Sequence, residues 1–219
     1  MTRILILGAT GRTGAAILNA LPAGVHAIAA LRKSADANRL AATAASLAHV
    51  VVNLENPASV RRAIEGTQIV VNAIRLRENI AAGELVTLHN RILAANQSMQ
   101  DAAPKIVTIG GAGALRLPTG QRFWETSAFP QATLPRGRAH AALRDHLEAG
   151  KGGDAWTYLI PPPAYDPDGP TLEQWERFAP GADETSFIAR TISYTDFGAA
   201  VAEIATSDDA GTHLIAWPR

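Results

Sequence analysis

Cysteine is absent from the 219 residues of this chain, and its absence excludes several kinds of chemistry at once. Disulfide bonds, a thiolate nucleophile and a cysteine-ligated metal are all ruled out. The six histidines include no pair at the i, i+4 spacing that would place two ligands on one helix face. We therefore predict no metal site.

A surplus of basic residues is also lacking, because 20 Lys and Arg are balanced by 20 Asp and Glu. Nucleic-acid-binding proteins normally carry a basic excess, so we expect no nucleic-acid partner. Long apolar runs are missing as well. The run from Ile4 to Leu7 is too short for a signal sequence or a membrane span. We expect a cytoplasmic protein without membrane contact.

Short β-branched runs alternate with helical patterns along the chain. Strands are predicted at 4–7, 25–31, 50–54, 69–74, 106–109, 156–160 and 213–217. Helices are predicted at 13–21, 36–47, about 80–102, 137–149 and 195–205, and one more begins at Pro57 after the N-cap Asn56. An apolar stripe marks the long helix, formed by Leu85, Leu88, Ile92, Ala95 and Met99. This alternation predicts a single α/β domain over 1–219, with a Rossmann-type doubly wound parallel sheet.

Two stretches, 111–136 and 161–192, interrupt this alternation and are rich in Pro, Gly and aromatic residues. Long irregular segments in a compact domain are usually functional or disordered. Both stretches follow predicted strands, so they should lie at the carboxyl edge of the sheet, where ligands bind in open α/β folds. We interpret them as substrate-side loops.

The segment Gly8-Ala9-Thr10-Gly11-Arg12-Thr13-Gly14 joins the first strand to the first helix. Gly8 permits a tight turn, Gly11 lets the backbone approach a pyrophosphate, and Gly14 lets the helix pack close to the strand. The N-terminus of the helix offers N–H groups and partial positive charge to phosphates. We predict a dinucleotide site at Gly8, Thr10, Gly11, Arg12, Thr13 and Gly14.

The end of the second strand distinguishes NADP from NAD. An acidic residue there binds the ribose 2′-hydroxyl, whereas arginine accommodates a 2′-phosphate. This chain has Arg32 and Lys33, with no acid before Asp36, and Arg12 adds a nearby guanidinium. Because a guanidinium donates paired hydrogen bonds to phosphate, NADP(H) is favoured over NAD(H). The alternative is that Arg32 and Lys33 are solvated surface charges.

The ends of three later strands complete the predicted cofactor site. Asn53 can meet the adenine and Leu54 can pack against its ring, although an ordinary strand-end turn explains Asn53 equally well. The remaining predicted cofactor residues are Ala73, Ile74, Gly110 and Gly111.

The chain resembles the atypical short-chain dehydrogenases/reductases, and within them the NAD(P)H-binding proteins described as NADH-flavin reductases. It is similar in layout to biliverdin reductase B, a mammalian flavin reductase. The resemblance rests on Gly8–Gly14, Ala30–Lys33, Val107–Leu115, Arg138–Ala141 and Arg190–Phe197. It implies a reductase that passes hydride from NADPH to a planar acceptor such as a flavin or quinone, with FMN or FAD as candidate acceptors.

Two positions depart from the family pattern. Val52 and Asn53 replace a Gly-Asp pair after the third strand, and Arg75 replaces a small residue after the fourth. The first change weakens the adenine assignment. The guanidinium of Arg75 could contact phosphate or hinder the nicotinamide half.

The Tyr-x-x-x-Lys proton relay of the superfamily is missing. The residues four positions after Tyr158, Tyr165 and Tyr194 are proline or glycine, and the lysines stand at 33, 105 and 151. Ordinary alcohol dehydrogenation is therefore disfavoured. Hydride transfer to a flat acceptor demands less, because the cofactor carries the chemistry.

The sequence offers one candidate proton donor, His140. The alternative is that His140 serves only in packing or helix capping. The predicted acceptor pocket consists of Gly113, Phe123, Trp124, Pro161 and Tyr165, with core or loop packing as the alternative for the aromatic residues. Two other functions stay open: a non-catalytic NADP(H) sensor or scaffold, and an NADP-using isomerase or epimerase. The expected partner is a small planar molecule, and the expected assembly is a monomer or homodimer.

Overall fold

An eight-stranded sheet runs through the computed structural model, which describes residues 1–97 and 103–219. Its strand order is β3-β2-β1-β4-β5-β6-β10-β8. All its pairings are parallel except that of β8 with β10. The strands are β1 (Thr2–Leu7), β2 (Val25–Leu31), β3 (Ser46–Val51), β4 (Ile69–Asn72), β5 (Lys105–Ile109), β6 (Trp156–Ile160), β8 (Glu176–Phe178) and β10 (Gly211–Ala216).

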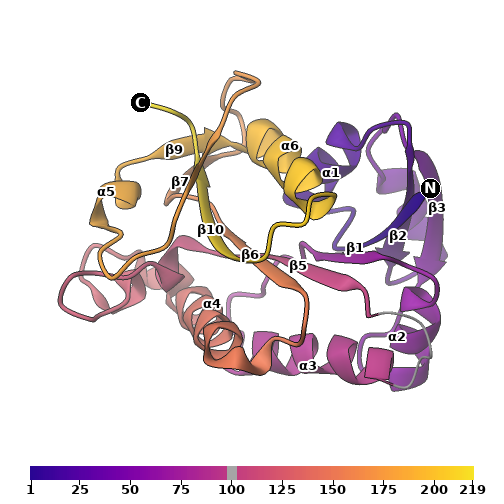
Figure 1. Cartoon of the computed structure of the whole chain (residues 1–219), viewed down its shortest axis with the longest axis horizontal. Coiled ribbons are helices and arrows are strands. Elements are labelled where there is room, and N and C mark those ends of the chain that lie inside the picture. Colours follow the sequence, from indigo (N-terminus) through magenta and orange to yellow (C-terminus); the bar gives the residue numbers. More distant parts are fainter. Residues whose placement is uncertain (98–102) are drawn as a thin grey trace.

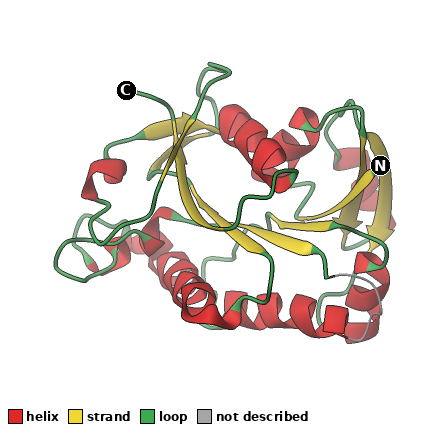
Figure 2. Cartoon of the chain, viewed as in Figure 1, coloured by secondary structure: helices red, strands yellow, loops and turns green. Residues whose placement is uncertain are grey.

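Helices cover both faces of this sheet (Figure 1). One face carries α1 (Arg12–Ala20) and α6 (Tyr194–Ala205), and the other carries α2 (Pro57–Ile64), α3 (Glu84–Gln97) and α4 (Leu134–His146). Figure 2 shows the sheet between these two helical layers. The predicted Rossmann-type, doubly wound single domain is confirmed.

Burial on both faces explains the continuous apolar run of β1. Ile4 and Ile6 belong to the core beneath α1 and α6, whereas Leu5 and Leu7 belong to the core beneath α2 and α3. A strand with an alternating polar face could not occupy this place. The strand order reverses beside β1, where β2 lies on one side and β4 on the other. Such a switch point opens a crevice at the carboxyl ends of the strands.

Several local predictions are confirmed. The Asn56 side chain accepts hydrogen bonds from the N–H groups of Ala58 and Ser59, so it caps α2 as expected. Leu85, Ile92 and Ala95 of the α3 stripe are buried. Met99 and the end of the predicted helix lie outside the described residues.

Within the described ranges, no helix has the length and apolar character needed to span a bilayer.

The helix predicted at 36–47 is wrong. Ser34–Arg39 forms a short 3₁₀ helix, and β3 already begins at Ser46. Asp36 and Asn38 favour turns over helices, and alanine propensity is weak against the gain from pairing Ser46–Val51 with β2. The third strand is accordingly displaced from the predicted 50–54, and its largely exposed side chains explain its weak signal.

The stretches predicted as irregular contain short elements. Residues 161–192 include β7 (Ala164–Asp166) and α5 (Thr185–Ile188), and they supply β8 to the sheet edge. The stretch ends within β9 (Thr191–Ser193). β7 and β9 form a separate parallel pair. Elements of this length give too little periodicity to be predicted from the sequence alone.

A buried ion pair holds the second stretch against α4. Arg144 and Glu184 are 0% and 1% exposed in their side chains. Both terminal nitrogens of Arg144 donate to the Glu184 carboxylate at 2.7 Å. Glu184 also accepts hydrogen bonds from the backbone N–H groups of Arg116 and Gly181. One carboxylate therefore joins α4 to both substrate-side loops.

Candidate functional site

A cavity of about 1180 Å³ opens at the carboxyl ends of the central strands. Leu7, Leu31 and Ile109, the last residues of β1, β2 and β5, all line it. Its walls come from the glycine loop before α1, the first turns of α4 and the segment after β6. The cavity thus lies at the carboxyl edge of the sheet, where the sequence predicted the substrate-side loops, and it adjoins the switch point.

The glycine loop has the geometry of a phosphate cradle. Gly8 adopts φ +80°, and a Cβ there would lie 2.5 Å from the carbonyl oxygen of Ala73. A Cβ on Gly14 would lie 2.2 Å from the oxygen of Gly8, so α1 packs directly against the loop. Gly11, the N-cap, has only that oxygen nearby, at 3.2 Å, and it lines the cavity. The first turn of α1 can therefore offer its N–H groups to an anion.

Basic side chains surround the adjoining part of the cavity. Arg12, Arg32, Lys33 and Arg39 all line it, and Arg39 pairs with Asp36 at 3.6 Å. Arg12, Arg32 and Lys33 are exposed. The donor set and the cradle together fit the phosphates of a dinucleotide.

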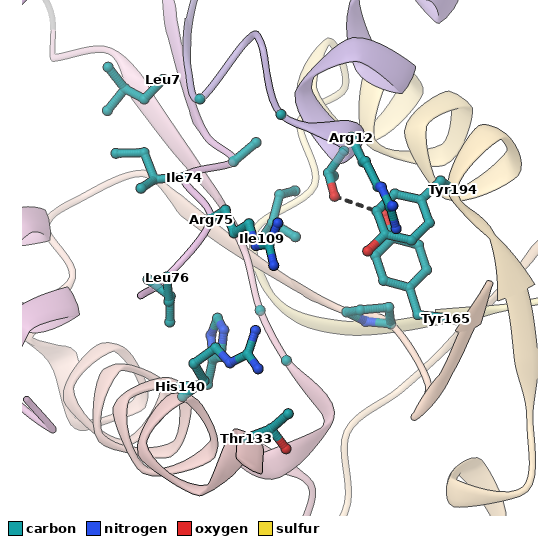
Figure 3. Close-up of a pocket in the computed structure, with 18 of the residues that line it drawn as sticks. Leu7, Arg12, Ile74, Arg75, Leu76, Ile109, Thr133, His140, Tyr165 and Tyr194 are labelled. Carbon is teal, nitrogen blue, oxygen red and sulfur yellow. Dashed lines mark hydrogen bonds between the residues drawn. The ribbon is translucent and has the colours of Figure 1, made fainter. Parts of the chain in front are cut away.

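Two tyrosines close one side of the glycine loop (Figure 3). Tyr165 and Tyr194 stack with ring centroids 3.8 Å apart and planes 11° from parallel. The Tyr165 hydroxyl lies 3.1 Å from the Thr13 hydroxyl, which ties β7 to the start of α1. Burial raises the pKa of Tyr165, so its hydroxyl stays protonated. Through this contact Tyr165 holds the glycine loop.

His140 projects from α4 on the opposite side of the cavity from Arg12 (Figure 3). Its Nδ1 lies 3.1 Å from the Tyr158 hydroxyl, and that hydroxyl donates to the His140 carbonyl oxygen at 3.0 Å. Because a hydroxyl has one hydrogen, Nδ1 must carry a hydrogen to complete the contact. The neutral ring then presents Nε2 as an acceptor.

The charge state of His140 follows from its surroundings. Burial, assisted by the positive charge of Arg136, lowers the pKa of His140 to about 4. The imidazole is therefore neutral at neutral pH. Neutrality and the Nδ1–H tautomer together favour a hydrogen-bond acceptor over a proton donor. A catalytic role for His140 stays a prediction.

The cavity brings together most of the predicted site residues. From the predicted cofactor set it is lined by Gly8, Thr10, Gly11, Arg12, Thr13, Arg32, Lys33, Leu54, Ala73, Ile74, Gly110 and Gly111. From the predicted acceptor set it is lined by Gly113, Phe123, Pro161 and Tyr165. Their individual roles in binding stay predictions.

Three predicted residues do not line the cavity. The Asn53 side chain accepts a hydrogen bond from the Glu55 N–H at 3.0 Å, so it forms the strand-end turn that was the alternative. Trp124 packs outside, with the Arg138 guanidinium 5.0 Å from its ring centroid. Gly14 is buried between helix and loop, where its role is steric.

Other residues of the cavity were not predicted. Arg136 stands four positions before His140 on α4, and this i, i+4 spacing is the signal that could have revealed it. The others include Leu76, Phe129, Thr133 and Tyr194. They come from separate segments of the chain, and no local sequence pattern indicates that these segments meet.

Comparisons with known proteins agree with this architecture. No curated protein sequence matches the chain significantly. Among solved structures, a "putative NADH-flavin reductase" from Streptococcus pneumoniae is 19% identical, with a TM-score of 0.75 and coverage of 100% of both chains. A "putative epimerase" from Bacteroides thetaiotaomicron is 19% identical with a TM-score of 0.81, covering 100% of this chain and 98% of the other.

A "putative exported protein" from Burkholderia pseudomallei is 22% identical, with a TM-score of 0.77 and coverage of 99% of this chain and 100% of the other. At such identities these likenesses establish the fold. The family model described as NAD(P)H-binding matches residues 8–208, beginning at the first glycine of the cradle. The chain therefore belongs to the NAD(P)H-binding family.

Proposed function

We propose that this protein is an NADPH-dependent reductase that passes hydride to a planar acceptor such as a flavin or quinone. One observation carries the proposal. A single cavity joins a basic phosphate cradle to a glycine floor with apolar walls. When bound, the dinucleotide supplies the hydride. The protein must then bind both molecules, align them and exclude water.

The phosphate side of the cavity is suited to NADPH. The first turn of α1 and the Gly11 backbone would hold the pyrophosphate. Arg32 and Lys33 follow β2, where the adenine ribose lies in this fold, and both side chains are exposed and free to meet a 2′-phosphate. The first carboxylate after β2 is Asp36, which follows Arg32 and Lys33 and pairs with Arg39 at 3.6 Å.

Glycines and apolar residues line much of the acceptor side. Gly110 and Gly111 pack on Tyr158 and His140, so that a Cβ on either glycine would clash at 2.8 or 2.6 Å. Leu76, Phe129 and Pro161 add apolar surface around this floor. An apolar slot of this kind can stack a conjugated ring and exclude water.

The side chains available as proton donors favour acceptors that need no acid from the protein. Tyr158 donates its hydrogen to a backbone carbonyl, and burial raises its pKa. His140 is neutral, as described above. A flavin or quinone that has accepted hydride can take its proton from solvent once it leaves the site. Oxidation of an alcohol instead needs a base beside the hydroxyl during hydride transfer.

The test is steady-state oxidation of NADPH across a panel of flavins and quinones, with Gly11→Val as the binding-deficient control. We expect turnover with at least one planar acceptor and none in the control. If the native protein binds NADPH but oxidises it with no acceptor, the reductase proposal fails. The non-catalytic sensor or scaffold then becomes the better account.

A further inference from the structure

The acceptor half of the cavity carries positive charge that no carboxylate compensates. Six cationic side chains line the cavity, whereas among the described residues Asp36 is the one carboxylate that does so. Asp36 lies after β2 and pairs with Arg39. The charges of Arg75 and Arg136, which lie after β4 and on α4, are left without such a partner. This imbalance contrasts with the zero net charge of the chain.

Arg136 is the more deeply placed of these two cations. It is partly buried, and its Nε is enclosed without a hydrogen-bond partner. None of the ion pairs found in the described part of the chain involves it. Enclosing an unpartnered N–H of a charged group costs free energy, which an anionic ligand bound to the same guanidinium would offset.

The position of Arg136 separates it from the phosphate cradle. It lies in the first turn of α4, which packs on residues 112–114 after β5, whereas the cradle precedes α1 after β1. Figure 3 shows Arg12 and His140, one turn from Arg136, on opposite sides of the cavity, with Arg75 between them. The charge of Arg136 therefore lies on the His140 side of the cavity, away from the phosphate cradle.

We propose that Arg136 recognises an anionic group, a phosphate or a carboxylate, on the planar acceptor. This inference rests on the proposed reductase function and narrows its substrate class. Arg75 adds a second positive charge nearby, and the N-terminus of α4 adds the partial charge of its dipole. A guanidinium binds either anion through paired, charge-assisted hydrogen bonds.

The experiment measures binding, so that it does not depend on turnover. The protein is saturated with NADP⁺, which occupies the phosphate cradle, and is then titrated with FMN or riboflavin while flavin fluorescence is followed. A naphthoquinone and its carboxylate derivative form a second pair, which separates carboxylate from phosphate recognition. Arg136→Met removes the charge but keeps the apolar stem. Arg138→Met, on the same helix but outside the cavity, is the matched control.

We expect the native protein to bind at least one anionic member about 10- to 100-fold more tightly than its neutral counterpart. Arg136→Met should abolish this discrimination and leave the affinity for the neutral member unchanged, while Arg138→Met should retain it. Equal affinities within both pairs in the native protein would overturn the inference. So would an Arg136→Met variant that still discriminates, or that weakens both members equally. Absence of NADPH oxidation with intact discrimination would instead overturn the reductase function alone.

Discussion

The neutral state of His140 can be tested through the pH dependence of stability. In the unfolded chain the imidazole binds a proton below its ordinary pKa of 6.5, whereas in the folded protein it does so only below about 4. Between these values the unfolded state holds more protons, so acidification favours unfolding. The stability that depends on a neutral His140 is complete above pH 6.5 and is lost as the pH falls through about 4.

The size of this effect follows from the shift in the pKa of His140. Each pKa unit corresponds to about 1.4 kcal/mol, and water screens part of the penalty because the residue is only partly buried. We therefore expect the free energy of unfolding to fall by about 2–3 kcal/mol on acidification. The variant His140→Asn cannot titrate and retains a donor that can reach Tyr158. Its free energy of unfolding should therefore fall less steeply on acidification than that of the native protein.

The assay is urea denaturation at a series of pH values from about 7.5 to about 4.5. Other titrating groups contribute equally to both proteins, so the difference between the curves isolates His140. His49→Asn, at an exposed position on the edge strand, should follow the native curve. Parallel native and His140→Asn curves would refute the reasoning.

A corollary concerns turnover. Turnover should fall by less than about 10-fold in His140→Asn, whereas loss of a proton donor costs about 100-fold or more.

Three further outcomes are expected. Gly11→Val places branched carbons in the phosphate cradle, and only the Gly8 oxygen lies near the new Cβ, so the fold should be retained. Calorimetry should find NADPH binding abolished, and undiminished binding would contradict the cradle assignment. Arg32→Asp should shift the NADPH-to-NADH ratio of dissociation constants by about 10- to 100-fold toward NADH, and an unchanged ratio would make Arg32 a surface charge. Glu184→Ala leaves Arg144 buried without its bidentate partner, so stability should fall by about 3–5 kcal/mol and the melting temperature by about 6–20 °C. Glu203→Ala removes the half-exposed partner of Arg177 and should change stability by less than about 1 kcal/mol; equal losses in the two variants would argue against the buried pair.

The sequence by itself determined the features whose physical causes are local. The apolar run at Ile4–Leu7 predicts a strand covered on both faces, and Asn56-Pro57 predicts a helix start, because each constraint involves neighbouring residues. The glycine spacing of 8–14 also depends on local sterics, because Gly14 in the first turn of α1 packs on the Gly8 carbonyl six positions earlier. The fold and the cradle could therefore be predicted together.

Only the tertiary structure decided how distant side chains meet. Residues 36–47 are alanine-rich, yet pairing with β2 makes Ser46–Val51 a strand. Asn53 and Trp124 follow strands or loops that reach the site, but local hydrogen bonding and packing turn them away from the cavity. Arg136 and His140 line it because α4 packs on residues 112–114, directly after β5, and the Tyr158 hydroxyl of β6 contacts the imidazole. These contacts join residues on separate βα units, and their energies depend on burial and charge that arise only when the units pack.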